Sequence, residues 1–193
     1  MRIISGKAKG RNIKAPEGYD TRPVTDKIRQ SLFNIWQWDI QGCNFLDLFS
    51  GSGSMGIEAM SRGANRVVMV EKADKAVRVI QENIRSCDLQ DVDHIVYAED
   101  VFSVIEKLKN RQEMFDIIYL DPPYTVDEIF HPVMEALGKA NLLKEDGILV
   151  IRTRKEKEMN DVYGNLTKYR EKVYGISKAH FYELCEDSSV KEC

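Results

Sequence analysis

The stretch FLDLFSGSGSMG, residues 45–56, runs from apolar positions through three glycines into a helical pattern. Glycine lets the backbone turn tightly, and its missing Cβ lets a ligand approach the main chain closely. A strand that leads through such a loop into a helix is typical of the first βα unit of an open α/β sheet, where ligands bind at the carboxyl ends of the strands. This stretch therefore predicts both a fold class and the place of a ligand site.

Outward from this stretch, short apolar runs alternate with helical patterns. Strands are expected at residues 44–49, 66–71, 94–99, 115–120 and 147–152, and helices near 54–62, 74–87, 102–109 and 127–140. This alternation predicts βαβ units and a mostly parallel sheet with helices on both faces. Two later runs, 168–175 and 178–184, have no helix between them and predict a closing antiparallel hairpin. We therefore expect an α/β fold with a seven-stranded sheet.

The N-terminal part of the chain has a different pattern. A small β-hairpin is expected before residue 16, broken by Gly6 and Gly10, followed by an amphipathic helix over residues 25–38. Trp36 is expected in the core, whereas Trp38 fits either core or surface. The chain is accordingly divided into an N-terminal arm at 1–40, a main domain at 41–186 and a tail at 187–193.

The composition is that of an ordinary globular protein, with 43% hydrophobic and 31% charged residues. No apolar run approaches the roughly 18 residues that span a bilayer, and no apolar segment follows the basic start, so we expect a cytoplasmic protein without membrane contact. The cysteines lack zinc-binding spacing, which favours reduced thiols and no metal. Cysteines occur at positions 43, 87, 185 and 193.

Charge is divided unevenly along the chain. Residues 1–40 carry a net charge of +4, whereas the rest carries −7, for a total of −3. A basic arm on an acidic body is the distribution expected when one end of a protein meets phosphates, although a solvated terminal segment explains the charge alone equally well. The candidate phosphate contacts are Lys7, Lys9, Arg11 and Lys14.

The glycine loop has two interpretations. Gly51, Gly53 and Gly56 match the dinucleotide fingerprint, and Glu71 follows Gly51 by 20 residues, as expected for an acid that binds ribose hydroxyls. This pattern alone permits an NAD-dependent oxidoreductase. However, a carboxylate at Asp47 would oppose a pyrophosphate and suits a cationic amino group, which favours S-adenosylmethionine over NAD.

The motif Asp121-Pro122-Pro123-Tyr124 ends the expected strand 115–120. Two consecutive prolines stop a strand and remove two N–H donors, so the turn presents a carboxylate and carbonyl acceptors beyond the sheet edge. A tyrosine ring beside them offers a face on which a planar base can stack. This combination fits a heterocyclic amine held by the Asp121 carboxylate and the Pro122 carbonyl, with catalysis by orientation and hydrogen bonding.

With these motifs the chain resembles the class I S-adenosylmethionine-dependent methyltransferases that act on exocyclic amines. The start MRIISGKAKGRNIKAP, the stretch TRPVTDKIR at 21–29 and FLDLFSGSGSMGIEAMSRGA resemble the RsmD family, which methylates guanine N2 in bacterial 16S ribosomal RNA. The resemblance extends to about Leu184. It implies a Rossmann-like methyltransferase fold, with 16S rRNA in the small subunit or its assembly intermediate as partner. The sequence identifies no obligate protein partner.

The resemblance also implies roles for individual residues. The Asp-Pro-Pro-Tyr motif would hold the target base, and Arg29 would join the arm residues on the substrate side. Asp100 with Val101 would contact adenine, although Asp100 alone is more typical of a helix cap. The remaining cofactor contacts implied are Asp47, Ser50, Gly51, Ser52, Gly53 and Gly56 for the methionine part, Glu71 for the ribose, its neighbour Lys72, and Arg22 and Thr25 over the cofactor.

Two points stay open from the sequence. Residues 152–157 are basic where we expect relatives to carry an acid, and this departure leaves the role of that strand end undefined. The substrate also stays open, because an Asp-Pro-Pro-Tyr motif fits adenine N6 in DNA as well as guanine N2 in RNA. A non-catalytic RNA-binding module is disfavoured because the catalytic turn is intact.

Overall fold

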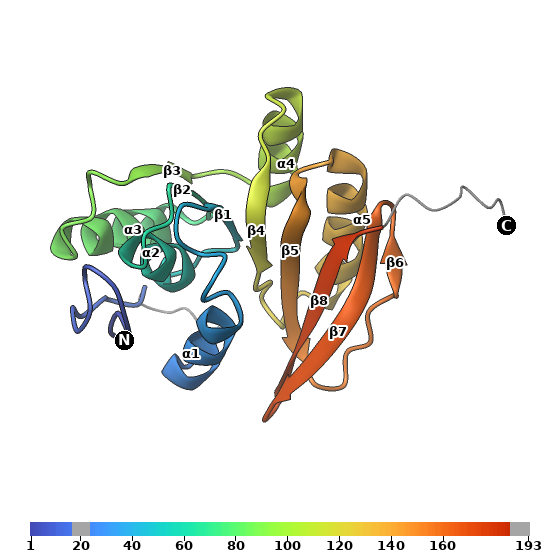
Figure 1. The fold of residues 1–193 in the computed structure, drawn as a ribbon, viewed down its shortest axis with the longest axis horizontal. Coiled ribbons are helices and arrows are strands. Elements are labelled where there is room, and N and C mark those ends of the chain that lie inside the picture. The colour runs from blue at the N-terminus through green and yellow to red at the C-terminus, as the bar shows by residue number, and fades with distance from the viewer. Residues whose placement is uncertain (17–23, 186–193) are drawn as a thin grey trace, which may run out of the picture.

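The sheet carries most of the structure. The computed structural model describes residues 1–16 and 24–185, and its eight strands lie in the order β3-β2-β1-β4-β5-β8-β7-β6 (Figure 1). Strands β1 to β5 pair in parallel, whereas β8, β7 and β6 continue the sheet in antiparallel pairing. The strands are β1 Asn44–Leu48, β2 Arg66–Val70, β3 Asp93–Tyr97, β4 Phe115–Leu120, β5 Leu143–Arg154, β6 Val162–Tyr163, β7 Leu166–Tyr174 and β8 Ser177–Leu184.

The predicted α/β class, the mostly parallel sheet and the closing hairpin are confirmed, but the predicted number of strands is wrong. The strand that the sequence analysis lacked is β6, which is two residues long and too short to leave a hydropathy pattern. The helices are α1 Asp26–Ile35, α2 Ser54–Ser61, α3 Asp74–Ser86, α4 Val101–Asn110, a 3₁₀ turn η1 Asp127–Ile129, and α5 Phe130–Ala140. None of the helices described is long and apolar enough to cross a bilayer.

Helices cover both faces of the sheet, as the alternation predicted. Side chains from α1, α2 and α3 pack with one face of the sheet, where Phe45 and Tyr119 point. Side chains from α4 and α5 pack with the other face, where Leu46 and Ile118 point. Because successive residues of a strand point to opposite faces, a residue's parity within the strand decides which helical layer it meets. The same rule decides to which face of the sheet the polar residues at the strand ends point.

The N-terminal arm packs against α2. Its expected hairpin is reduced to one isolated antiparallel bridge between Arg2 and Asn12. The backbone amides of Ile4 and Ser5 both donate to the buried carboxylate of Glu58, at 2.8 and 3.0 Å. The short pairing follows from this anchor, because α2 satisfies backbone donors that a partner strand would otherwise take.

Helix α1 begins with a clear signal and ends earlier than expected. Thr25 is its N-cap, with the side chain accepting from the amide of Ile28, and the helix ends at Ile35 rather than at the expected residue 38. Trp36 is fully buried against Phe33, as predicted, whereas Trp38 is 86% exposed. The described cysteines are free thiols at positions 43, 87 and 185.

Candidate functional site

The glycine loop between β1 and α2 is held by main-chain hydrogen bonds, one to β2 and one within the loop. The Ser50 amide donates to the carbonyl of Val70 at 2.9 Å, and the Gly53 amide donates to the carbonyl of Ser50 at 2.7 Å. Gly51 and Gly53 have φ angles of 55° and 76°, which glycine adopts without strain. The loop therefore has a fixed shape at the carboxyl end of β1.

Asp47 lies beneath this loop and is almost completely buried. Its carboxylate Oδ2 accepts the amide of Gly56 at 3.1 Å, within the first turn of α2. Burial raises the pKa of Asp47 to about 8, partly opposed by this hydrogen bond. An N-terminal amide of α2 that a pyrophosphate would need is thus already engaged by a carboxylate, which argues against a dinucleotide here.

Gly56 and Gly53 serve packing rather than ligand contact. A Cβ at Gly56 would come within 2.6 Å of the Met69 sulfur, so glycine lets α2 lie close to β2. A Cβ at Gly53 would come within 3.1 Å of Ile80 on α3. Neither glycine lines the cavity described below, so their predicted cofactor contacts are indirect in this structure.

Glu71 follows β2 and faces the glycine loop. One carboxylate oxygen accepts the Gly51 amide at 3.0 Å, and the other accepts the Ala73 amide at 2.9 Å. Glu71 is therefore fixed by two main-chain donors, in a geometry suited to diol hydroxyls.

Asn83 of α3, which the sequence analysis did not select, joins the glycine loop to the N-terminal arm. Its side-chain amide donates to the carbonyls of Ser52 and Lys14 at 3.0 and 2.9 Å.

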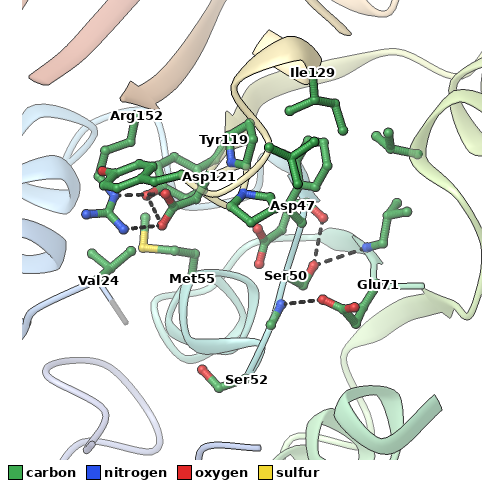
Figure 2. A pocket seen from close by; sticks show the side chains of 18 of the residues that line it. Val24, Asp47, Ser50, Ser52, Met55, Glu71, Tyr119, Asp121, Ile129 and Arg152 are labelled. Atoms are coloured by element: carbon green, nitrogen blue, oxygen red, sulfur yellow. Dashed lines mark hydrogen bonds and ion pairs between the residues drawn. The ribbon is translucent and has the colours of Figure 1, made fainter. Parts of the chain in front are cut away.

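A cavity of about 610 Å³ opens along the carboxyl ends of β1, β2, β4 and β5. Figure 2 shows Asp47, Ser50 and Glu71 on one side of it and Asp121 with Arg152 on the other. The predicted residues that line it are Asp47, Ser50, Gly51, Ser52, Glu71, Lys72, Asp100, Val101, Asp121, Pro122, Pro123 and Tyr124. The two motifs selected from the sequence thus meet at one cavity.

Asp121 carries a feature that the sequence analysis did not predict. Both of its carboxylate oxygens are paired with the guanidinium of Arg152, at 3.0 Å from Nε to Oδ1 and 2.6 Å from Nη2 to Oδ2. The hydroxyl of Tyr119 donates to Oδ2 at 3.5 Å. Burial raises the pKa of Asp121, and Arg152 opposes that rise.

Tyr124 stands beside this pair. Its hydroxyl donates to the carbonyl of Thr153 at 3.1 Å, which fixes the ring against the end of β5. The guanidinium carbons of Arg152 and Arg154 lie 5.3 and 5.9 Å from the ring centroid. Burial raises the pKa of Tyr124 to about 12, so its hydroxyl stays protonated at neutral pH.

Asp100 caps α4, the alternative that the sequence analysis preferred for this residue alone. Its Oδ1 accepts the amide of Phe102 at 2.9 Å. Asp100 and Val101 also line the cavity, so the cap and the predicted adenine contact are compatible. A side chain fixed as a cap presents a defined carboxylate at the cavity wall.

The predicted substrate residues divide into two groups. Lys7, Lys9, Arg11 and Lys14 are all exposed. Arg11 pairs with Asp88, which follows α3, and Lys14 pairs with Glu82 on α3.

Arg29, by contrast, is fully buried, and the expectation that it contacts substrate is wrong for this structure. Its guanidinium pairs with Asp26 at 2.9 Å, lies 3.8 Å from the carboxylate of Glu58, and donates to the carbonyl of Arg2. It presents no surface to a phosphate and instead ties α1 to α2 and the arm. Thr25 caps α1 and does not line the cavity, although its neighbour Val24 does. Arg22 lies outside the described residues.

Other cavity residues were also missed. Val24 and Ile129 add apolar surface, and Phe49 enters the glycine loop with a φ of 65°, a conformation rarely taken by side-chain-bearing residues. Arg152 carried a signal, since it is the charged residue that follows the apolar run GILVI. The other three are ordinary apolar residues, two in loops and Ile129 in η1, and leave no sequence signal.

The residues present fit S-adenosylmethionine. The missing Cβ of Gly51 leaves room beside the main chain, the buried Asp47 suits an ammonium group, and Glu71 suits ribose hydroxyls. A cavity of about 610 Å³ is large enough for a nucleoside of this size, with a target base beside it. The amine-accepting turn lies along the same cavity.

The fold and site define a class of protein, the Rossmann-like methyltransferases. The structure matches that of "Putative methyltransferase yhhF from Escherichia coli" with a TM-score of 0.80 at 26% identity, covering 95% of this chain and 97% of that one. Among curated proteins it is 35% identical to "Putative rRNA methyltransferase YlbH" of Bacillus subtilis over 95% of this chain and 98% of the relative. It is 28% identical to "Ribosomal RNA small subunit methyltransferase D" of Haemophilus influenzae, over 95% and 93% respectively.

The family model described as "Conserved hypothetical protein 95" matches residues 1–183. The chain therefore belongs to this family, which its relatives named methyltransferase D identify as the RsmD family that the sequence resembles.

Proposed function

We propose that this protein is an S-adenosylmethionine-dependent methyltransferase that acts on the exocyclic N2 amine of a guanine in small-subunit ribosomal RNA. One observation carries the proposal: the glycine loop after β1 and the Asp121–Tyr124 turn after β4 line a single cavity. The family of the chain and the names of its relatives support ribosomal RNA as the substrate class. Action in the cytoplasm, where ribosomal subunits assemble, is part of the proposal.

The chain's own residues divide the work between two sides of the cavity. Asp47 and Glu71 hold the polar ends of the cofactor, and Asp100 with Val101 holds its adenine. When bound, S-adenosylmethionine would supply the methyl group: the amine lone pair would form the new nitrogen–carbon bond, the carbon–sulfur electrons would stay on sulfur, and one amine proton would leave to solvent.

Asp121 and the Pro122 carbonyl accept hydrogen bonds from the amine and draw it out of conjugation with the ring, so that its lone pair becomes available. Tyr124 stacks on the base, which must leave any stacked position in the RNA to reach it.

The exposed cations of the arm extend this surface beyond the cavity. Ala15 and Pro16 line the cavity directly after Lys14. Earlier in the arm, the Lys7 amide donates to the carbonyl of Ser61 at the end of α2 at 2.7 Å, and Lys9 follows two residues later. RNA phosphates are proposed to follow this path from the cavity along the arm. Replacing Lys7 and Lys9 by Ala should weaken RNA binding and reduce the slope of log affinity against log salt by about one per residue.

The test uses methyl-labelled cofactor with small ribosomal subunits, protein-free total RNA and DNA in parallel, each digested to nucleosides afterwards. Label in N2-methylguanosine from ribosomal RNA supports the proposal, and the better acceptor shows whether free RNA or an assembled particle is recognised. Label in N6-methyladenine from DNA favours the alternative substrate instead. If no acceptor is methylated but RNA binds tightly, the protein is a non-catalytic RNA-binding module rather than a methyltransferase.

A further inference from the structure

Arg152 is a buried cation at the reacting side of the cavity. It follows the apolar run GILVI in β5, and its side chain is only 6% exposed. In the parallel register Leu120 of β4 lies beside Ile151 of β5, so Asp121 and Arg152 are the next pair along. Because Tyr119 and Val150 both point to the α1–α3 face, Asp121 and Arg152 point to that face too.

The pairing uses most of the accepting capacity of Asp121. Each carboxylate oxygen has two lone pairs. Oδ2 accepts from Arg152 Nη2 at 2.6 Å and from the Tyr119 hydroxyl at 3.5 Å, whereas Oδ1 accepts only from Arg152 Nε at 3.0 Å among the described residues. The remaining position for an amine hydrogen is therefore on Oδ1.

Arg152 also reaches the ring on which a base would stack. Its guanidinium carbon lies 5.3 Å from the centroid of Tyr124, which is itself fixed by the carbonyl of Thr153. One side chain thus contacts both the acceptor carboxylate and the stacking ring. Two parallel N–H···O bonds fix the plane of a carboxylate, which a single lysine ammonium does not do.

The charges around Asp121 make this pairing consequential. The titratable groups of the described chain that face Asp121 are Arg152 from β5, Tyr119 from β4, Tyr124 from the next loop and Asp47 from β1. Arg152 is the cation among these four. Without it, burial would favour a protonated Asp121, which accepts hydrogen bonds less well.

We propose that Arg152 is a positioning residue for methyl transfer: by pairing with both oxygens of Asp121, it fixes the carboxylate plane and directs the remaining lone pair of Oδ1 toward the amine of the target base. The inference rests on the proposed function, since it assigns a role within that site. Arg152 acts through Asp121 and Tyr124 and does not itself contact the amine.

Two variants separate the parts of this role. Arg152→Lys keeps the charge and loses the two-point geometry, and kcat is expected to fall about 10-fold, with the acid limb of its pH profile unchanged. Arg152→Gln loses both, and kcat is expected to fall about 100-fold, with the acid limb moved to higher pH. The KM for cofactor should stay within about twofold in both, because the glycine loop and Glu71 are untouched.

The matched control is Arg66→Gln, which removes a guanidinium paired with Asp93 and Glu113 at the amino ends of the strands. It should keep the wild-type kcat and pH profile. Wild-type kcat in Arg152→Lys, or an unmoved acid limb in Arg152→Gln, overturns the inference. If the Gln variant does not fold, the kcat of the Lys variant decides, because that variant keeps the buried charge balance.

A second measurement does not depend on activity. The Asp121 carboxyl carbon, observed by NMR in labelled protein and assigned through Asp121→Asn, should titrate at higher pH in Arg152→Gln than in the wild type. An unchanged titration overturns the inference even if no nucleic acid accepts a methyl group. Conversely, failure of wild-type protein to methylate any acceptor overturns the proposed function, while the NMR result still decides whether Arg152 holds Asp121 in its ionised form.

Discussion

The two sides of the cavity are built from different interactions. On the cofactor side, backbone amides hold the acids: Gly51 and Ala73 donate to Glu71, and Gly56 donates to Asp47. On the substrate side, a side chain from a neighbouring strand holds the acid, since Arg152 pairs with Asp121. Both arrangements fix a carboxylate at the end of a parallel strand.

The difference has consequences for mutation and for prediction from sequence. Amide donors belong to the chain whatever its side chains are, so the cofactor side depends mainly on glycines and loop length. A side-chain pair is lost with either partner, and truncating one leaves the other buried without its counter-charge. Single substitutions on the substrate side should therefore mainly lower kcat, whereas those on the cofactor side should mainly weaken cofactor binding.

Removing the substrate-side acid should have the largest effect. Asp121→Ala is expected to lower kcat by about 100- to 1,000-fold, because the amine loses its charged acceptor, while cofactor affinity stays within about threefold. Single-turnover transfer and calorimetric titration with S-adenosylhomocysteine measure the two quantities. Asp121→Asn provides a variant of the same shape in case the unpaired Arg152 destabilises the alanine protein.

The control for this comparison is Asp116→Ala, which removes a carboxylate paired with Lys144 at the other end of β4. It should leave transfer unchanged. Turnover near the wild-type rate in both Asp121 variants would show that the substrate side does not depend on this acid.

The cofactor-side acid should instead control affinity. Glu71→Gln is expected to weaken cofactor binding by about 10-fold, because one acceptor and the charge are lost, while kcat at saturating cofactor stays near the wild-type value. Glu113→Gln, at a carboxylate far from the cavity, is the matched control. A fall in kcat at saturating cofactor as large as that in Asp121→Ala would remove the distinction between the two sides.

Asp47 should make cofactor affinity depend on pH. Burial raises its pKa to about 8, and a cationic amino group binds the ionised form, so the association constant should rise between pH 6 and 8 by up to about 10-fold per unit. Asp47→Asn should bind more weakly and with a flat profile. Titration calorimetry at several pH values tests this, and a flat profile in the wild type would contradict the role of Asp47.

The unliganded protein gives a second check on Asp47. Its pKa in the folded state lies above that of the unfolded chain, so between about pH 4 and 8 the unfolded state loses a proton that the folded state keeps. This group therefore lowers the free energy of unfolding as pH rises through that range. Denaturant titrations should show the slope in the wild type and a smaller one in Asp47→Asn.

The smallest effect is expected at the Tyr124 hydroxyl. Tyr124→Phe loses the bond to the Thr153 carbonyl but keeps the ring, so KM for RNA and kcat should change by less than about threefold. Tyr124→Leu loses the stacking face and should raise KM for RNA by about 10-fold or more. Equal losses in both variants would show that the hydroxyl, rather than the ring, supports the substrate side.

The sequence predicted most of the fold because hydropathy period and glycine position are local properties. The loop 50–56, the ends of β1, β2 and β4, and the closing hairpin all follow from residues adjacent in the chain. The two-residue strand β6 leaves no periodic pattern. Helix α1 ends at Ile35, before the exposed Trp38, and the apolar stripe by itself does not mark that end.

What escaped prediction in the site is non-local. The Asp121–Arg152 pair depends on the register of β4 against β5, and the burial of Arg29 depends on Glu58, which lies on another helix. Arg29 stands three and four residues before the buried Leu32 and Phe33, so helical spacing permits its burial, but a guanidinium is costly to bury without partners. Neither partner can be identified from spacing in one sequence.

The cavity wall is shared by widely separated parts of the chain, since Ala15 and Pro16 line it together with Ile176. Protein synthesis proceeds from the N-terminus, so a nascent chain carrying only the first five strands already contains the glycine loop and the Asp121–Tyr124 turn. It still lacks the hairpin tip that completes the wall. The methyl-transfer site can therefore be assembled only when translation of the chain is almost finished.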